Sequence, residues 1–280
     1  MDKKPSHVRT VIAYIVLIIL TFLCLFFFYI LVINCTRSHQ QIQAGFSFLP
    51  GKYFAQNFNN VIHDAKLPVL SGIKNSLIVS ACCAALATYF SALTAYGLYA
   101  YDFKLKKPAF IFIMLILVMP TQVSAMGFIN VITKMGMINT LYPLILPSVA
   151  APAVFYFMYS YMQSSLPLEL IEAARIDGCN EFKTFNRIVL PIMKPAIAVQ
   201  AIFAFVQNWN NYFIPALVLQ DNSKRTLPIL IAMLRSADFL KFDMGKVYML
   251  ITIAIVPIII VYIALSRYIV AGVALGGVKE

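Results

Sequence analysis

The chain has 280 residues, of which 61% are hydrophobic and 12% charged, and its formal net charge at pH 7 is +11. A soluble globular domain averages about 25% charged residues, so a chain this apolar could not cover its own surface in water. The basic excess forms no run with interleaved aromatic residues, which argues against nucleic-acid binding. Composition therefore indicates an integral membrane protein, whose loops are ordinarily basic where they meet anionic lipid.

Six apolar runs without a single charged residue dominate the chain. They cover residues 11–33, 75–99, 109–133, 142–162, 195–219 and 247–266. A membrane-spanning helix needs about 20 mostly apolar residues, and each charge at mid-bilayer would cost roughly 2.5–3.5 kcal/mol on insertion scales. The first run exceeds the roughly 7–15 residues of a signal-peptide core, and no small-residue cleavage site follows it. We predict one all-α membrane domain over residues 1–280, with six spanning helices.

An even number of spans places both termini on one side of the membrane. Basic residues at the N-terminus (Lys3, Lys4, Arg9) and between the second and third spans (Lys104, Lys106, Lys107) favour the cytoplasm for that side. The opposite loop, 220–246, is also basic, so charge alone orients the chain weakly. That loop contains "TLPILIAMLRSADFL", which is too short and too charged to span and is predicted to form an interfacial or re-entrant helix.

Prolines interrupt several of the predicted spans. They are Pro120, Pro147, Pro152, Pro215 and Pro257. Each removes a backbone hydrogen bond and kinks its helix. Irregular backbone at membrane depth is tolerated only inside protein or against a water-filled cavity. The prolines therefore indicate either ordinary kinks or a pathway whose walls change conformation, and the sequence leaves both open.

One segment in the middle of the chain, 168–191, is densely charged. Eight charged residues lie between positions 169 and 194, and burying them in lipid would cost on the order of 20 kcal/mol. Ser164 or Ser165 is expected to cap a helix whose first turn holds Pro167. Gly178 is expected to end that helix, and Asn180 to cap a second one. The pattern predicts an exposed helix, a sharp turn and a short second helix.

The chemistry of this segment favours a protein partner over a lipid surface. Glu172 lies early in the first helix, and Ala173 and Ala174 keep its middle thin, so that another surface can approach closely. Phe182 and Phe185 on the second helix could fill a pocket. The alternative is an amphipathic helix lying on lipid, but such helices prefer polar faces rich in Lys and Arg, whereas this segment carries mixed charge. A docking carboxylate would be matched by an arginine in a shielded groove.

The stretch "EAARIDGCNEFKTFNRIVLPIMKPA" resembles the EAA motif of ABC importer permeases, the loop that docks into the ATPase subunit. The residues that match are Glu172, Ala173, Ala174, Asp177, Gly178, Phe185, Ile188, Leu190, Pro191 and Pro195. Further stretches, "KNSLIVS", "GMINTLYPLILP", "NWNNYFIPALVL", "RTLPILI" and "RYIVAGVALGGVKE", resemble the carbohydrate-uptake branch, and within it the maltose-permease G-type subunits. The chain departs from the family pattern at Cys179, Phe182 and Gly277, where Ala, Trp and Ala are usual.

The resemblance implies fold, partners and orientation. It implies a type I importer core with a cytoplasmic coupling loop at 165–191, in which Glu172, Ala173, Ala174, Asp177, Gly178, Phe182 and Phe185 contact or shape the contact with the ATPase. The family's loop is cytoplasmic, so both termini of a multi-pass protein of the bacterial cytoplasmic membrane would be cytoplasmic too. The implied partners are an ATPase dimer, a second and non-identical permease subunit, an extracytoplasmic sugar-binding protein and membrane lipid.

No Walker sequence GxxxxGK[ST] occurs in the chain, so ATP hydrolysis is expected on a separate subunit. The five cysteines and three histidines show no ligand spacing, and no cofactor or metal is expected in this chain. ATP and magnesium would be bound by the partner ATPase. A membrane-embedded enzyme is disfavoured because no span carries a charged residue, and a channel would not need the charged docking loop.

A solute pathway is expected near the amide-rich stretch "QNWNNYF". The candidate residues are Gln122, Gln207, Asn208, Trp209, Asn210, Asn211 and Tyr212. Amides hydrogen-bond sugar hydroxyls without a charge penalty, and an indole face stacks on a pyranose ring, so Trp209→Ala is expected to weaken uptake. The competing interpretation is that these amides only join helices, at about 0.6–2 kcal/mol each. The sequence predicts an importer permease for a sugar or oligosaccharide, and the alternative is a different small polar solute.

Overall fold

The computed structural model describes residues 7–64, 66–235 and 243–276, with side chains over 9–64, 66–235 and 243–266. The described residues do not include Lys3 and Lys4, which were used to predict the orientation, or the tail 277–280, which was used in the family resemblance. Over the described ranges the chain is helical, without a strand. It divides into two compact units, residues 1–67 with 231–256 and residues 68–230 with 257–280. The prediction of one domain stays a prediction.

The first unit holds α1 (His7–Cys35), α2 (His39–Gln43), α3 (Phe54–Ile62) and the first part of α15 (Met244–Gly276). Its polar contacts gather where α1 ends. The amide of Asn57 on α3 donates to the carbonyls of Cys35 and Arg37, each at 2.9 Å. The ammonium of Lys246 on α15 lies 3.0 Å from a carboxylate oxygen of Asp64. These bonds tie the end of α1 to α3, and the start of α15 to the chain just after α3.

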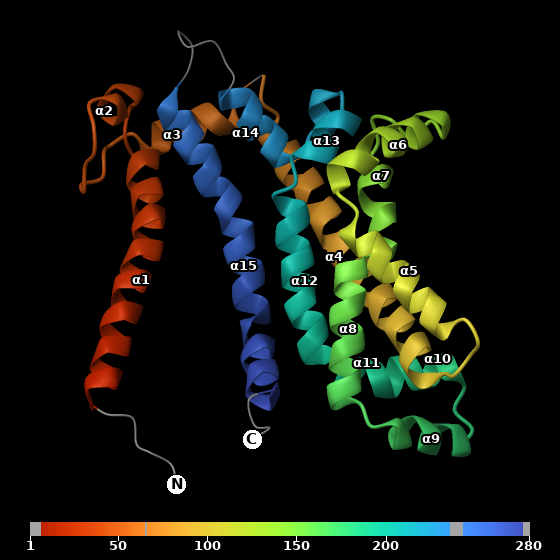
Figure 1. The fold of residues 1–280 in the computed structure, drawn as a ribbon. Helices are drawn as coiled ribbons and strands as arrows, with labels where there is room; N and C mark the ends of the chain where they lie inside the picture. The colour runs from red at the N-terminus through yellow and green to blue at the C-terminus, as the bar shows by residue number, and fades with distance from the viewer. Residues whose placement is uncertain (1–6, 65, 236–242, 277–280) are drawn as a thin grey trace. The chain divides into compact units, whose positions relative to one another are not determined.

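The second unit is built around one long helix, α4 (Val69–Ala100). The elements that follow are α5 (Lys106–Val118), α6 (Thr121–Lys134), α7 (Tyr142–Ile145), η1 (Leu146–Val149), α8 (Pro152–Ser165), α9 (Leu168–Ile176), α10 (Glu181–Thr184), η2 (Phe185–Val189), α11 (Leu190–Ile192), α12 (Lys194–Trp209), α13 (Phe213–Val218) and η3 (Asn222–Lys224). The next helix, α14 (Leu227–Arg235), begins in this unit. Within the unit, α9, α10 and α11 lie at one end, and α6, α7 and α13 at the other (Figure 1).

Small side chains let α4 pack closely against α8 and α12, which run beside it (Figure 1). The buried small residues of α4 are Gly72, Ser76, Ser80, Cys83, Ala84, Ala87, Thr88, Ser91, Ala92 and Ala95. In a membrane the lipid tails are as apolar as the side chains, so helices associate through close contact between small residues and through hydrogen bonds. The composition of α4 therefore explains why it forms the centre of the second unit.

Four helical stretches are long and apolar enough to cross a membrane: Arg9–Cys35, Val69–Ala100, Tyr142–Ser165 and Met244–Ser266. Two bent pairs of helices, Lys106–Val118 with Thr121–Lys134 and Glu181–Ile192 with Lys194–Trp209, would bring the number to six if each pair is one span. The all-helical membrane architecture is thus as predicted, and the exact count of spans stays a prediction. The predicted helix in the 220–246 loop is α14, although residues 236–242 lie outside the described part.

Several of the predicted spans that contain prolines are broken, whereas Pro257 lies inside the continuous helix α15. Pro120 separates α5 from α6, and these two helices bend by 100°. Pro147 lies in η1, and Pro152 opens α8. The predicted run 195–219 also ends early, because α12 stops at Trp209 and α13 starts at Phe213. The amide-rich stretch therefore lies at a helix end, where it was expected inside a continuous helix.

Candidate functional site

The charged segment 165–191, called the coupling segment below, folds as helix, turn and helix. Pro167 occupies the N-cap of α9, so neither Ser164 nor Ser165 caps it as predicted. Gly178 ends the turn with φ +76°, a conformation open to glycine at little cost, and its amide donates to the carbonyl of Arg175 at 3.0 Å. The side chain of Asn180 accepts a hydrogen bond from the amide of Lys183 at 2.9 Å, which confirms the predicted second cap.

The predicted coupling residues divide between an exposed and a buried face. Glu172, Ala173, Asp177, Gly178 and Phe182 are exposed, and Phe182 retains 70% of its accessible surface. Ala174 and Phe185 are buried within the second unit, at 4% and 0% exposure. Phe185 therefore fills a pocket of this chain, not of a partner.

A second exposed apolar side chain, which was not among the predicted coupling residues, lies just before the turn at Gly178. Ile176, the last residue of α9, is 85% exposed. Ile176 and Phe182 flank the turn at Gly178, so the tip of the coupling segment presents two apolar groups. The signal was available in the sequence, because Ile176 lies off the apolar face formed by Leu168, Ile171 and Ala174.

A hydrogen-bonded cluster holds the two helices of the coupling segment together. The Nε of Arg175 on α9 donates to Oε1 of Glu181 on α10 at 2.8 Å. The hydroxyl of Tyr96 on α4 donates to the other carboxylate oxygen, Oε2, at 2.6 Å. The guanidinium carbon of Arg175 also lies 5.0 Å from the ring centroid of Tyr101. Each oxygen of Glu181 thus has its own donor, one from the segment and one from α4.

This cluster fixes the charge state of Glu181. Burial opposes ionisation, but the hydrogen bonds from Arg175, Tyr101 and Tyr96 outweigh it and lower the pKa of Glu181 to about 2. The hydrogen bond to Glu181 likewise raises the pKa of Arg175. The pKa of Tyr101 is raised by burial and by its hydrogen bond to the carboxylate. The cluster was not predicted from the sequence, because Tyr96 is 85 positions from Glu181 and only folding brings them together.

A cavity of about 420 Å³ lies between helices of the second unit. Its wall comes from α4, α6, α7, η1, α8, α12 and α13. The lining residues are Val79, Ala87, Thr121, Ser124, Ala125, Phe128, Pro143, Leu144, Pro147, Ser148, Ala151, Val154, Ala204, Gln207, Asn208, Asn211, Ile214 and Pro215. None of them is ionisable, and the polar ones carry hydroxyls or amides.

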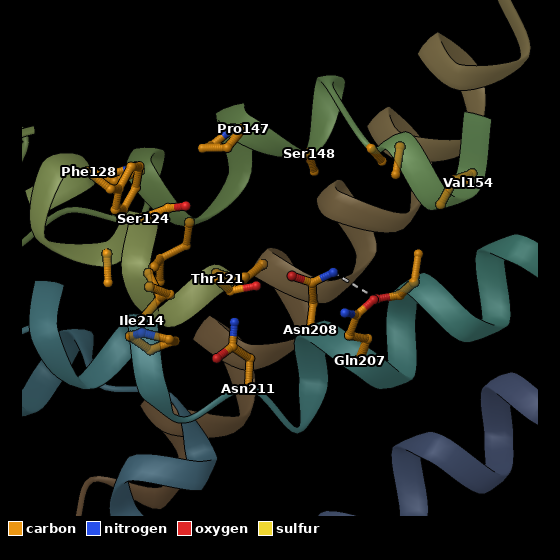
Figure 2. Close-up of a pocket in the computed structure, with 18 residues that line it drawn as sticks. Thr121, Ser124, Phe128, Pro147, Ser148, Val154, Gln207, Asn208, Asn211 and Ile214 are labelled. Carbon is orange, nitrogen blue, oxygen red and sulfur yellow. Dashed lines mark hydrogen bonds between the residues drawn. The ribbon is translucent and has the colours of Figure 1, made fainter. Parts of the chain in front are cut away.

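Three of the predicted pathway residues, Gln207, Asn208 and Asn211, line this cavity. Figure 2 shows their amides across from Thr121 and Ser124 of α6. The Asn208 amide also donates to the carbonyl of Ala204 at 2.8 Å, so this side chain both lines the cavity and bonds its own helix.

The other four pathway residues, Gln122, Trp209, Asn210 and Tyr212, are not part of the cavity wall. Gln122, Asn210 and Tyr212 are exposed. Trp209 is buried at 2% exposure, with its ring 5.7 Å from that of Phe205 and nearly parallel to it. Neighbouring polar residues reach the cavity instead, since Thr121 and Ser124 line it on either side of Gln122 in sequence.

Breaks in the helices lie along this cavity. Pro143, Pro147 and Pro215 belong to its wall, and the break between α12 and α13 contributes Asn211. Non-helical backbone at membrane depth needs protein or water as its partner. The position of these breaks favours the interpretation of the prolines as walls of a pathway over that of ordinary kinks.

The chain as a whole matches a known family of transport proteins. Residues 84–274 match the model described as "Binding-protein-dependent transport system inner membrane component". This range holds both the coupling segment and most of the cavity. The chain belongs to this family.

Similar proteins make the class more specific. The chain is 35% identical over 232 residues to the arabinooligosaccharides transport system permease protein of Halalkalibacterium halodurans, covering 83% of this chain and 82% of that protein. It is 29% identical to the trehalose/maltose transport system permease protein of Thermococcus litoralis, covering 99% of each. A solved chain of a bacterial ABC transporter involved in the import of the acidic polysaccharide alginate shares the fold, with a TM-score of 0.80, 18% identity, and coverage of 96% and 99%.

These matches confirm that the protein is the membrane permease component of an ABC importer and a transport subunit, not an enzyme. Such a component works with an ATPase and with a substrate-binding protein. The resemblance inferred from the EAA motif is confirmed, as is the type I permease fold.

Proposed function

We propose that this permease carries an uncharged sugar or oligosaccharide into the cell, as one of two non-identical permease subunits in a complex powered by an ATPase dimer. The observation that carries the substrate class is the chemistry of the cavity. Its wall offers amides and hydroxyls from Gln207, Asn208, Asn211, Thr121 and Ser124, with no ionisable side chain. Such groups exchange hydrogen bonds with sugar hydroxyls without the cost of burying a charge.

The two sequence relatives compared above are named for arabinooligosaccharides and for trehalose and maltose, which supports a sugar or oligosaccharide as the substrate. The solved structure with the same fold is named for an acidic polysaccharide, so the proposal of an uncharged substrate rests on the cavity wall. The alternative is a different small polar solute. A charged solute is disfavoured, because a desolvated anion needs a cationic or strongly donating partner, and the cavity wall has no Lys, Arg or His.

The coupling segment is proposed to lie in the cytoplasm together with both termini, and to dock into the ATPase. Glu172 is exposed on α9 and would pair with an arginine of the ATPase groove. Ala173 beside it allows close approach, while Ile176 and Phe182 would enter apolar parts of the same groove. ATP and magnesium would be bound by the ATPase, and closure of that dimer would move the segment. Lipid would cover the outer faces of the spans.

The substrate proposal is tested by uptake into proteoliposomes that contain the importer with its ATPase, its partner permease and its binding protein. The probes are arabinotriose, maltose, trehalose and a uronate trisaccharide from alginate. ATP-dependent uptake of one of the neutral sugars, with none of the uronate, is the expected result. Uptake of the uronate alone would overturn the proposal for an uncharged substrate.

The docking proposal is tested with Glu172→Ala, which removes the exposed carboxylate. The variant is expected to insert normally but to lose most of the stimulation of ATP hydrolysis by the loaded binding protein. Glu169→Ala is the matched control, because Glu169 is also exposed on α9 but lies outside the matching motif. Equal stimulation in the Glu172 variant and the unchanged importer would contradict the docking role.

A further inference from the structure

Three tyrosines on α4 contact the coupling segment from one side of that helix. Tyr89, Tyr96 and Tyr99 are seven and three residues apart, a spacing that keeps side chains on one face of a helix. The hydroxyl of Tyr99 donates to the carbonyl of Leu166 at 2.7 Å. The hydroxyl of Tyr89 lies 3.3 Å from Oδ1 of Asn186. The contacts of these tyrosines therefore extend along the segment from its start into its second helix.

The central contact is the one between Tyr96 and Glu181. Tyr96 is 3% exposed, and its ring packs 5.6 Å from that of Phe185 and 6.1 Å from that of Tyr101. Its hydroxyl meets an ionised carboxylate, and hydrogen bonds to charged groups are stronger than those between neutral groups. The same carboxylate binds Arg175 on the first helix of the segment. A force on α9 can thus reach α4 through two short polar contacts.

The other part of α4 forms part of the cavity wall. Val79 and Ala87 line the cavity, and the carbonyl of Leu144, another lining residue, lies 3.2 Å from the Sγ of Cys83. One continuous helix therefore joins the contacts with the coupling segment to the cavity, and rigid secondary elements are among the structures that carry coupling between distant sites.

We propose that Arg175, Glu181 and Tyr96 form a relay that passes movement of the docking helix α9 to α4 and so to the cavity wall. The proposal rests on the proposed docking of the coupling segment into an ATPase. All three are positioning residues: they touch neither ATP nor the transported solute.

The test measures movement of the cavity wall directly and needs no knowledge of the sugar. Ser148 lines the cavity on η1, which packs against α4. A Ser148→Cys change is made in an importer whose five native cysteines are replaced by alanine. The rate of its reaction with a charged methanethiosulfonate reagent is measured with and without a non-hydrolysable ATP analogue, in the assembled complex with ATPase. The measured quantity is the ratio of the two rates.

Two conservative changes break the relay while keeping its packing. Tyr96→Phe removes one hydroxyl and leaves the ring against Phe185, and Glu181→Gln removes the charge and keeps the shape. In each, the nucleotide-dependent change in rate is expected to shrink by about tenfold or more, the factor that a hydrogen bond to a charged group supports. Tyr29→Phe is the matched control, since it also removes a hydroxyl donor, which bonds the carbonyl of Phe48, and Tyr29 lies on α1, outside the cavity wall and the relay.

The outcomes separate the relay from a structural brace and from the docking itself. If both relay variants keep the nucleotide-dependent change in labelling rate, the relay is overturned. If both variants lose the ATPase on purification, the three residues are needed for folding and assembly, and the relay is likewise overturned. An equal loss in Tyr29→Phe would also count against it. Glu172→Ala is measured in parallel. If Glu172→Ala abolishes the nucleotide-dependent change in rate while the relay variants keep that change, only the relay proposal fails. If Glu172→Ala keeps the change, the docking proposal fails. No response in the unsubstituted importer would overturn both.

Discussion

Arg175 and Glu181 meet across the turn at Gly178, with the guanidinium Nε 2.8 Å from a carboxylate oxygen. The two side chains are 36% and 42% exposed, and an isolated surface pair of this kind contributes little. This pair differs because Tyr96, which is buried, holds the second oxygen of the same carboxylate. The pair thereby joins both helices of the coupling segment to α4.

The first prediction concerns acid stability. The hydrogen bonds to Glu181 lower its pKa from 4.5 to about 2, so the stabilisation that its charge brings is complete above pH 4.5 and is lost as the pH falls towards 2. Glu181→Gln should therefore lower the thermal midpoint of the purified importer at pH 6, and should flatten its decline between pH 4.5 and 2.5.

Arg175→Gln provides the control for that experiment, because it removes the cation that faces the carboxylate and leaves the two tyrosines in place. It should flatten the same part of the pH profile, and the double variant should add little to either single change. An unaltered acid decline in Glu181→Gln would contradict the assigned charge state.

The second prediction concerns the turn itself. A Cβ at Gly178 would meet nothing within 4 Å, but its φ of +76° is strained for any L residue. Gly178→Ala should therefore cost about 1–2 kcal/mol through the backbone alone. Gly127→Ala is the control, because it also has open space but lies inside α6 with no positive φ; it should stabilise by up to about 1 kcal/mol. Chemical unfolding in detergent measures both, and equal effects would contradict the assignment.

The coupling segment and the cavity differ in how far the sequence predicted them. The turn at Gly178, the cap at Asn180 and the exposure of Glu172 depend on local conformation and charge, which neighbouring residues determine. Tyr96 and Thr121 depend on which helices come together, and a hydropathy pattern without charges carries no such information. The same limit explains the prediction for Trp209. Its residue type indicated stacking on a sugar ring, but the sequence did not show that the side chain is buried.

The third prediction concerns Trp209, which was expected from the sequence to contact sugar. In the structure it is 2% exposed and stacks on Phe205. Trp209→Ala should therefore act through lost packing, at about 3 kcal/mol, and lower the thermal midpoint of the importer. Asn211→Ala, at the cavity wall, should instead weaken uptake with little effect on that midpoint. The result that would contradict this division is a normal midpoint for Trp209→Ala together with impaired uptake.

The last prediction concerns Asn139, which fastens two loops of the second unit. Its amide nitrogen donates to Oδ2 of Asp221 at 2.6 Å, and its amide oxygen accepts from the backbone of Gln220 and Asp221, each at 3.1 Å. Its φ is +61°, which asparagine tolerates better than most residues. Asn139→Gly keeps that backbone and removes the side-chain bonds, whereas Asn139→Ala removes the bonds and adds backbone strain of about 1 kcal/mol.

Hydrogen exchange of the amides of Gln220 and Asp221 separates the two effects. Both variants should exchange faster there than the unchanged protein, since both lose the acceptor. Asn139→Ala should in addition accelerate exchange at Asn139 itself, whose amide donates to the carbonyl of Val218 at 2.9 Å, because strain opens that turn. Equal protection in all three proteins would show that the asparagine does not fasten these loops, and a larger effect from glycine than from alanine would show that flexibility, not strain, governs the turn.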